Sequence, residues 1–275
     1  MRSMIFAFLC MLLMCCSNVS EKRNMELLSS DSLNVSEDSI ILDVDSVPLY
    51  AKNIIEAYPN FDLKYSNNRL IFADGTTIVC DDGRDKSFVD RLDNCDIEDM
   101  FSNSYDINSA MPLYLNDCGR GRCEQLFKKM YGGNETEVRR NLISVDWFGQ
   151  KILFTIVNGA AKQLSIVASE LAKQPQLHKY LINASSFYWR KVRGANRQSA
   201  HSYGIAIDIN TTYSNYWLWS NPKCSETDKI RYENHIPIEV IKVFEKHGFI
   251  WGGRWYHYDT MHFEYRPELL SRKQR

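Results

Sequence analysis

The stretch 199–210, with the sequence SAHSYGIAIDIN, constrains the fold of this chain more than any other. Its apolar run from Ile205 to Ile209 predicts a β-strand, on which successive side chains point to opposite faces. Ala206 and Asp208 then share one face, and the isoleucines share the other. A carboxylate on an otherwise apolar strand is costly unless a partner pairs with it. The sequence therefore predicts a polar site on one face of a buried strand.

His201 is the partner that the sequence offers to Asp208. Gly204 lies between them and allows the chain to bend, because glycine adopts backbone conformations that other residues avoid. Such a bend would bring the His201 ring to the same side as Asp208. This mixture of nitrogen and oxygen ligands is one that zinc favours. The alternative is a histidine and an aspartate that only hydrogen-bond across a turn, and this stretch alone leaves both open.

The stretch 251–264 near the C-terminus favours the metal site. It contains a third imidazole, His262, with Asp259 three residues before it. A catalytic zinc ion keeps three protein ligands and leaves a position for water. A carboxylate that does not bind the metal is then needed to take a proton from that water. We expect His201, Asp208 and His262 to bind the metal and Asp259 to be the general base.

The two stretches together resemble a known family, the zinc D-alanyl-D-alanine carboxypeptidases and L-alanyl-D-glutamate endopeptidases (VanX/VanY-like peptidases). Its pattern is Ser-x-His-x-x-Gly-x-Ala-x-Asp, followed later by Asp/Glu-x-x-His. The positions of the pattern are filled in order by Ser199, His201, Gly204, Ala206, Asp208, Asp259 and His262. The resemblance covers residues 150–275 by motif and residues 65–150 more loosely.

This resemblance implies an α+β fold, in which a small antiparallel sheet carries a zinc site and helices pack against it. It implies a peptidoglycan stem peptide as substrate and, most of all, a D-alanyl-D-alanine carboxypeptidase. An endopeptidase of the L-alanyl-D-glutamate type is the alternative, since the motifs leave open which bond is cut. A zinc-containing module that binds cell-wall peptides without cutting them is the competing class. Loss of Asp259 would mark such a module, but Asp259 is present.

The resemblance also implies roles for residues just before the first motif. The family places a functional arginine there, and Arg190 is the best match, with Arg193 as the alternative. Arg190 would stabilise the oxyanion, as fixed positive charge does in acyl transfer. Ser199 would hold the substrate or orient His201. We expect the other two cations of this stretch, Lys191 and Arg197, to lie on a solvated loop.

Four residues near His262 have more than one interpretation. His257 is a rival third ligand, but its offset of five residues places it on the opposite face of a strand from His262. Glu264 shares a strand face with His262 and is expected to support it. Trp251 and Trp255 are expected to wall the cleft, although a pair of core aromatics would have the same pattern.

The N-terminus predicts export. Arg2 precedes an apolar run at 4–14, which is too short to cross a bilayer as a mature helix and is typical of a signal peptide. The run ends in Leu-Met-Cys-Cys, which resembles a bacterial lipobox with Cys16 as the acylated residue. Cys15, or an ordinary signal peptide, is the alternative. We expect a bacterial lipoprotein of the cell envelope, held at a membrane by this lipid anchor.

Composition and local patterns divide the rest of the chain. Its 275 residues, 44% hydrophobic with a net charge of −1, suit a monomer with a substantial core and give no reason to expect nucleic acid as a partner. We expect a lipoprotein signal peptide at 1–16, a flexible tether at 17–45, an N-terminal α/β extension at 46–150 and the catalytic domain at 151–275. Predicted helices are 48–58, 124–131, 159–173 and 237–247, with a strand at 151–157 and a hairpin at 69–80 turning through Asp74-Gly75.

The acidic residues and the cysteines of the chain allow two further predictions. The acidic stretch 81–106 lacks a twelve-residue calcium loop, so we expect a solvated face. Five cysteines follow the signal peptide, and Cys118 and Cys123 are close enough in sequence to close a small disulfide loop.

Overall fold

A computed structural model describes residues 47–270, and these belong to one compact unit. The expected signal peptide at 1–16, its acylated Cys16 and the tether at 17–45 lie outside the described residues. Within 47–270, no helix combines the length and the apolar character needed to cross a bilayer.

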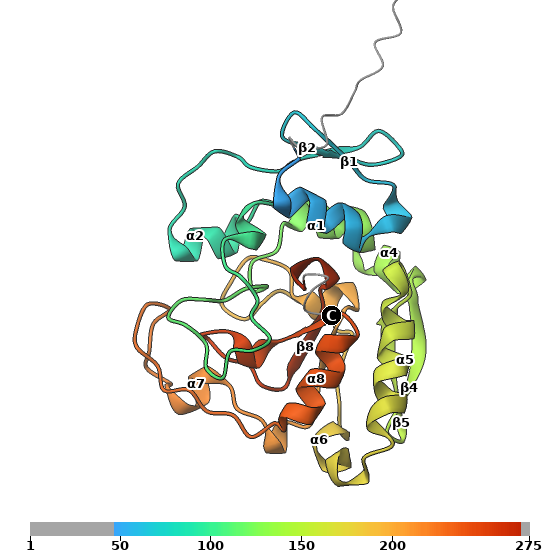
Figure 1. The fold of residues 1–275 in the computed structure, drawn as a ribbon, viewed down its shortest axis with the longest axis vertical. Coiled ribbons are helices and arrows are strands. Elements are labelled where there is room, and N and C mark those ends of the chain that lie inside the picture. The colour runs from blue at the N-terminus through green and yellow to red at the C-terminus, as the bar shows by residue number, and fades with distance from the viewer. Residues whose placement is uncertain (1–46, 271–275) are drawn as a thin grey trace, which may run out of the picture. The chain divides into compact units, whose positions relative to one another are not determined.

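The centre of the fold is a three-stranded antiparallel sheet. Its strands are β6 (Ala206–Asp208), β7 (Phe249–Trp251) and β8 (His262–Tyr265), in the order β6-β8-β7. The register places Asp208 of β6 directly opposite His262 of β8. The two sequence motifs therefore meet on neighbouring strands, and the predicted α+β fold with a small antiparallel sheet is confirmed (Figure 1).

Two helices pack on this part of the chain, α5 (Ala160–Leu171) and α8 (Ile238–Lys246). Phe244 of α8 stacks on Phe263 of β8, with ring centroids 3.9 Å apart. The helices are joined by His247, whose Nε2 lies 2.9 Å from the Glu170 carboxylate. Pro237, expected as the first residue of α8, is its N-cap instead.

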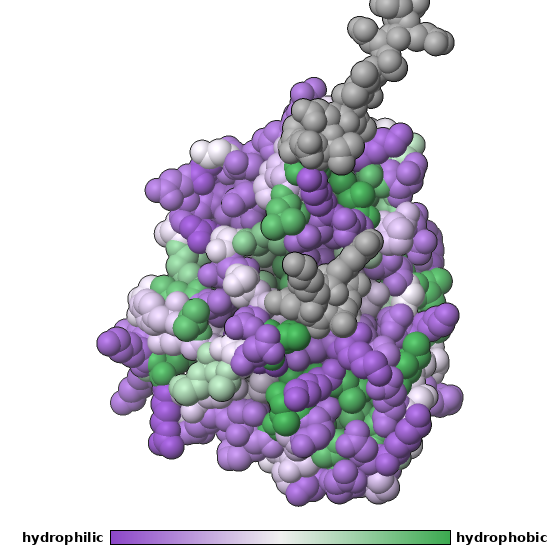
Figure 2. Space-filling model, viewed as in Figure 1, coloured by the Kyte–Doolittle hydropathy of each residue, from purple (hydrophilic) through white to green (hydrophobic). Residues whose placement is uncertain are grey.

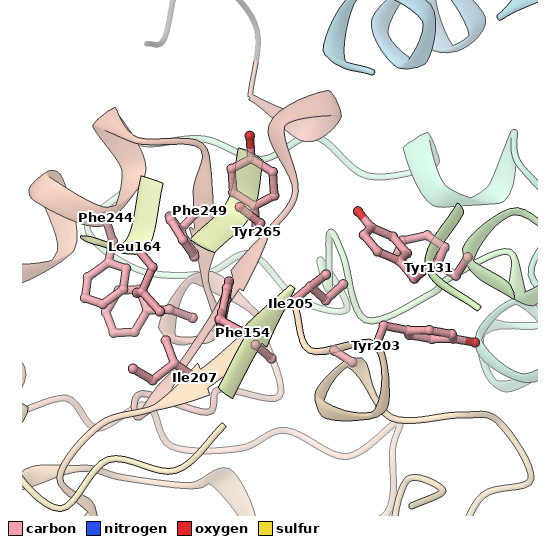
Figure 3. Packing of buried hydrophobic residues seen from close by; sticks show 14 of the residues in the cluster. Tyr131, Phe154, Leu164, Tyr203, Ile205, Ile207, Phe244, Phe249 and Tyr265 are labelled. Atoms are coloured by element: carbon pink, nitrogen blue, oxygen red, sulfur yellow. The ribbon is translucent and has the colours of Figure 1, made fainter. Parts of the chain in front are cut away.

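The apolar face of the predicted strand lies in the core. Ile205, Ile207 and Ile209 are completely buried. Figure 3 shows Ile205 between Phe154 and the pair of Tyr131 and Tyr203, while Ile207 lies on the other side of Phe154, toward Leu164 and Phe244. Deleting such side chains is costly, so this packing fixes the position of β6 and with it the position of Asp208.

A hairpin, β4 (Leu142–Trp147) with β5 (Gln150–Thr155), supports the segment before β6. The amide of Thr155 donates to the carbonyl of Gly204 at 2.9 Å. Gly204 has a φ of +66°, and a Cβ atom there would lie 2.4 Å from Cδ2 of Leu142. The bend between His201 and β6 thus requires glycine. The expected boundary at residue 150 falls inside this hairpin, and the division between extension and catalytic domain stays a prediction.

The remaining described residues before β4 form the α/β extension. It contains α1 (Leu49–Ala57), α2 (Phe88–Asp93), α3 (Glu124–Tyr131), α4 (Glu135–Arg140) and a sheet of β1 (Lys64–Ser66), β2 (Arg69–Ile71) and β3 (Thr77–Val79). Two short helices, α6 (His178–Leu181) and α7 (Trp217–Ser220), occur later in the chain.

The turn between β2 and β3 differs from the prediction. Phe72 and Thr76 are paired by a 2.9 Å hydrogen bond, which leaves a three-residue loop at 73–75. Only Gly75 has positive φ, whereas a type I′ turn requires positive φ at Asp74 as well. The hairpin is confirmed, but its turn was predicted wrongly.

The extension packs against the segment that contains β7 and β8. The indole of Trp255 donates to the carbonyl of Cys118 at 2.6 Å, and the hydroxyl of Tyr58 donates to Glu268 at 2.7 Å. A Cβ atom on Gly119 would lie 2.3 Å from Cδ1 of Ile250, so the loop at 117–122 approaches β7 as closely as glycine allows. The extension is thus part of the surroundings of the site. All five cysteines in the described residues are free thiols, so no Cys118–Cys123 disulfide is formed.

The surface on the face shown in Figure 2 is mainly hydrophilic, with hydrophobic side chains in small groups between polar ones. This distribution is usual for a folded domain, because polar side chains cannot cover a whole protein surface.

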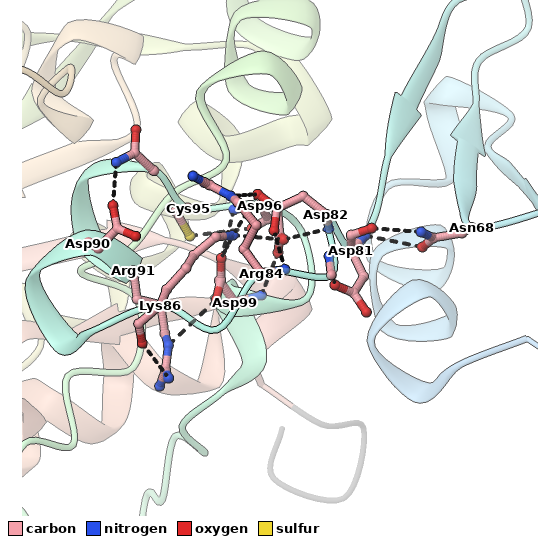
Figure 4. Close-up of polar contacts among 12 residues, drawn as sticks. Asn68, Asp81, Asp82, Arg84, Lys86, Asp90, Arg91, Cys95, Asp96 and Asp99 are labelled. Carbon is pink, nitrogen blue, oxygen red and sulfur yellow. Dashed lines mark hydrogen bonds and ion pairs between the residues drawn. The ribbon is translucent and has the colours of Figure 1, made fainter.

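Much of the acidic stretch of the extension is exposed, as expected, but part of it also surrounds a buried cation. Lys86, with a side chain only 1% exposed, lies 3.0 Å from Asp82, 2.9 Å from Asp96 and in contact with Asp99 (Figure 4). A single buried ammonium group thus contacts all three carboxylates. The sequence did not reveal this pairing because its partners extend over thirteen residues.

We predict that Lys86→Met destabilises the fold by about 3–5 kcal/mol, the cost of removing one partner from a buried ion pair. The variant removes the one cation that contacts all three carboxylates and leaves Asp82 and Asp99 with the more exposed Arg84 and Arg91. Denaturant unfolding followed by circular dichroism measures the change. Lys151→Met is the matched control, since Lys151 pairs with Asp146 on the surface and such pairs contribute little. Equal stability of the two variants would contradict a structural role for Lys86.

Candidate metal centre and active site

Three side chains from the two motifs converge on one point. His201 Nε2 lies 3.2 Å from Asp208 Oδ2, and His262 Nδ1 lies 2.9 Å from Asp208 Oδ1. The three can each offer one ligand atom, all within 4.8 Å of one another. His201 comes from a turn of 3-10 helix at Ala200–Tyr203, while Asp208 ends β6 and His262 begins β8. The bend at Gly204 and the register of β6 with β8 produce this convergence.

Each imidazole is oriented by a second hydrogen-bonding partner. Nδ1 of His201 donates to the carbonyl of Ser186 at 2.7 Å, which leaves the lone pair of Nε2 directed at the site. Nε2 of His262 lies 3.4 Å from Glu264 Oε2, which leaves Nδ1 as its ligand atom. Glu264 is completely buried and is itself held by Arg122 at 3.2 Å and Arg266 at 3.1 Å. The expected support of His262 by Glu264 is therefore present.

The charges of these groups suit a cation. Burial opposes ionisation of Asp208, but His201 and His262 outweigh it and lower the pKa of the carboxyl. Burial also opposes protonation of His262, but Asp208 and then Glu264 raise its pKa to about 10. In the absence of a metal, a proton thus takes the position of a positive charge beside Asp208. Two imidazoles and a carboxylate with fixed ring orientations fit a divalent metal ion, which would replace that proton.

Asp259 lies beside this group without belonging to it. Its Oδ1 is buried and has no hydrogen-bond partner among the described residues. Burial, and then the Asp208 carboxylate, raises the pKa of Asp259 to about 7. Its backbone is fixed on both sides, since its amide donates to Gly252 at 3.0 Å and its carbonyl accepts from His262 at 3.2 Å. A free carboxylate that titrates near neutral pH has the properties of a general base.

The expected arginine and serine lie at the same site. The amide of Ser199 donates to the carbonyl of Arg190 at 3.1 Å, so the two residues are adjacent, and Ser199 is buried. The side chain of Arg190 is exposed, with Nη1 3.4 Å from the carbonyl of Lys191. Its charge acts on Asp259, whose pKa it lowers.

These residues share a cavity of about 420 Å³. Its wall contains the three predicted ligands, Asp259, Arg190, Arg193, Ser199 and the rival ligand His257. It also contains side chains that the sequence did not connect with the site: Arg120, Arg122, Arg197, Tyr216, Trp217 and Trp219. Trp255 also lines it, as expected, whereas Trp251 is buried in the core. Arg197 was expected on a solvated loop, but it is buried and pairs with Asp93, which corrects that expectation.

A second group of acidic and histidine side chains lies near the cavity. It consists of Asp117, Glu226 and His257, with His257 Nδ1 2.6 Å from Asp117 Oδ2. Arg120 already bonds to Glu226 at 2.9 Å and 3.1 Å and to Asp117 at 2.5 Å. This guanidinium neutralises the two carboxylates, so the group is an ion-pair network. His257, the rival third ligand, belongs to this network.

Two kinds of groups at the site could not be predicted from the sequence. The carbonyl of Ser186 orients His201 through the backbone, which every residue possesses, so no side-chain pattern indicates it. Arg120 and Arg122 lie in the extension, about eighty residues before His201. Only the CGRGRC run at 118–123 marks them, with two arginines between glycines and cysteines.

Comparison with known proteins finds a match in the same region of the chain. Residues 193–265 match a protein-family model described as D-alanyl-D-alanine carboxypeptidase. The matched segment contains His201, Asp208, Asp259 and His262, but neither Arg190 nor the extension. None of the curated proteins and none of the solved structures compared with the chain matches it. The predicted ligands and the predicted base therefore all lie in a segment that is similar to D-alanyl-D-alanine carboxypeptidases.

Proposed function

We propose that the protein is a zinc-dependent D-alanyl-D-alanine carboxypeptidase that removes the last residue of peptidoglycan stem peptides. The observation that carries this proposal is the convergence of His201, Asp208 and His262 beside the unpaired carboxylate of Asp259, in a cavity of about 420 Å³. The family match of residues 193–265 supports the substrate class.

The residues of the cavity have separate tasks in this reaction. Zinc, when bound, supplies a Lewis acid that lowers the pKa of water to about 7 and polarises the scissile carbonyl. Asp259 takes a proton from the attacking water and passes it to the amine of the departing residue. Arg190 stabilises the negative charge that develops on the carbonyl oxygen. Ser199, adjacent to the Arg190 backbone, contacts the substrate.

We predict that the dialysed protein retains about one zinc ion per chain, as a site with three protein ligands does. His201→Ala and His262→Ala should each lose it, because two remaining ligands do not hold the ion through dialysis. Elemental mass spectrometry of the purified proteins measures the content. His235→Ala is the control, since His235 is exposed and bonds to Asn215 outside the site. Full zinc content in both ligand variants would show that the metal, if any, binds elsewhere.

The catalytic roles predict losses of turnover without loss of zinc. Asp259→Asn should reduce the rate by about 10²–10⁴-fold, the usual contribution of a general base. Arg190→Ala should reduce it by about 10²–10³-fold. Release of the terminal D-alanine from a defined muropeptide is the assay, with Arg69→Ala as control, since the Arg69 side chain is exposed on β2. An Asp259→Asn protein as fast as the parent would refute the mechanism, and a larger loss in Arg193→Ala than in Arg190→Ala would assign the oxyanion role to Arg193.

We also propose that the chain is exported and held at a membrane through a lipid on Cys16. The support is the apolar run at 4–14 followed by a sequence that resembles a lipobox. Metabolic labelling with a fatty acid should mark the parent, and Cys16→Ala should abolish the label. An unchanged label in Cys16→Ala would point to Cys15 instead.

A further inference from the structure

The cavity has a strongly cationic lining. Five arginines contribute to it, namely Arg120, Arg122, Arg190, Arg193 and Arg197. The carboxylates in its wall are Asp208 and Asp259, which both belong to the site of the reaction. The arginines that are buried in this wall therefore require a separate explanation.

Arg120 is explained by its own partners, because it is fully engaged with Asp117 and Glu226. Arg122 and Arg197 are different. Each has one nitrogen in an ion pair: Nη1 of Arg122 lies 3.2 Å from Glu264, and Nη1 of Arg197 contacts Asp93. In each of them Nε is buried and has no hydrogen-bond partner among residues 47–270. Their side chains are only 8% and 9% exposed.

Such an arrangement is unfavourable in the protein alone. A buried donor without an acceptor loses its bond to water and gains nothing in return. The positive charges also repel one another: burial, followed by repulsion from Arg122 and then Arg120, lowers the pKa of Arg197. An anion bound at the cavity wall, which both side chains line, would offset the repulsion between these charges. The planar guanidinium group fits a carboxylate in particular, because its donors match the two oxygens.

We propose that Arg122 and Arg197 form a subsite for the free terminal carboxylate of the peptide substrate. The inference rests on the proposed function and specifies which end of the peptide enters the cavity. At about 420 Å³ the cavity lies near the small end of the range for ligand sites, so a carboxylate at its wall is close to the scissile bond. Removal of a single terminal residue then follows, and cleavage inside a longer chain is disfavoured.

This subsite gives the extension a role. Arg122 lies in the loop at 117–122, outside the segment that matches the family model. The loop is fixed against the catalytic part, since Trp255 donates to the carbonyl of Cys118 and Arg266 donates to that of Gly119 at 3.1 Å. Arg197 lies two residues before Ser199, where the first motif begins, and it pairs with Asp93 of α2. The extension thus supplies one arginine of the pair and the partner that positions the other.

The test compares two ligands that differ only at the carboxylate. An N-acetylated stem peptide ending in D-alanyl-D-alanine is titrated into zinc-loaded Asp259→Asn protein by calorimetry, as the free acid and as the terminal amide. We expect the acid to bind about 10–100-fold more tightly, the range for hydrogen bonds to charged groups. Adding Arg197→Gln or Arg122→Gln should remove most of this preference, whereas Arg69→Gln, at an exposed position of β2, should leave it intact.

Arg122→Gln is interpreted only with full zinc content, because Arg122 contacts the Glu264 that supports His262. If Arg122→Gln loses zinc, the binding of acid and amide to Arg197→Gln alone tests the subsite. Equal binding of acid and amide overturns the subsite, as does a loss in Arg197→Gln that affects acid and amide alike. Turnover by the parent separates the two proposals: cleavage of both ligands at equal rates overturns the subsite alone. A clear preference for the acid without any cleavage supports the subsite and refutes the carboxypeptidase.

Discussion

The pairing of β6 with β8 is the constraint on which the site depends. It places Asp208 opposite His262, and the bend at Gly204 adds His201 to the same point. On a strand a shift of one residue would turn every side chain to the other face, so the register must be strongly fixed. The buried isoleucines of the opposite face fix it, because a slip would expose them. Burial of the apolar face of β6 thus fixes the position of Asp208 on the polar face.

The ionisable groups of the site contact one another in succession, starting from Asp208. Asp208 contacts both imidazoles, Glu264 contacts His262, and Arg122 and Arg266 hold Glu264. Each of these charged groups has a partner of opposite sign, which is the condition under which buried charges are tolerated. Asp259 is the exception, since its Oδ1 lacks a partner. An unpaired carboxylate next to three potential metal ligands is costly for folding but suited to proton transfer.

Local patterns predicted much of this. The apolar run at 205–209 predicted the strand, and the bend at Gly204 with the two family motifs predicted that His201, Asp208 and His262 meet. Helical periodicity predicted α5, and Pro237 with Gly248 predicted the bounds of α8. What the sequence could not predict depends on partners distant in the chain. The sequence neighbours of Arg197 are typical of a basic surface loop. Its ion-pair partner in the fold, Asp93, is 104 residues away in the sequence.

The extension shows the same limit. Its acidic stretch was predicted as a solvated face because local composition carries no sign of Lys86 folding into its centre. Its Arg120 and Arg122 reach the cavity because the loop at 117–122 packs against Ile250 and Trp255, a contact between parts of the chain more than a hundred residues apart. Residues from outside a family motif thus contribute to the cavity that the motif forms.

Product analysis of the zinc-loaded protein with a defined pentapeptide muropeptide tests the central claim most directly. Mass spectrometry should show loss of one terminal D-alanine and no internal cleavage, and a metal chelator should abolish the reaction. Fragments cut within the stem, cleavage that persists after metal removal, or an unchanged muropeptide would each contradict a zinc carboxypeptidase at His201, Asp208 and His262.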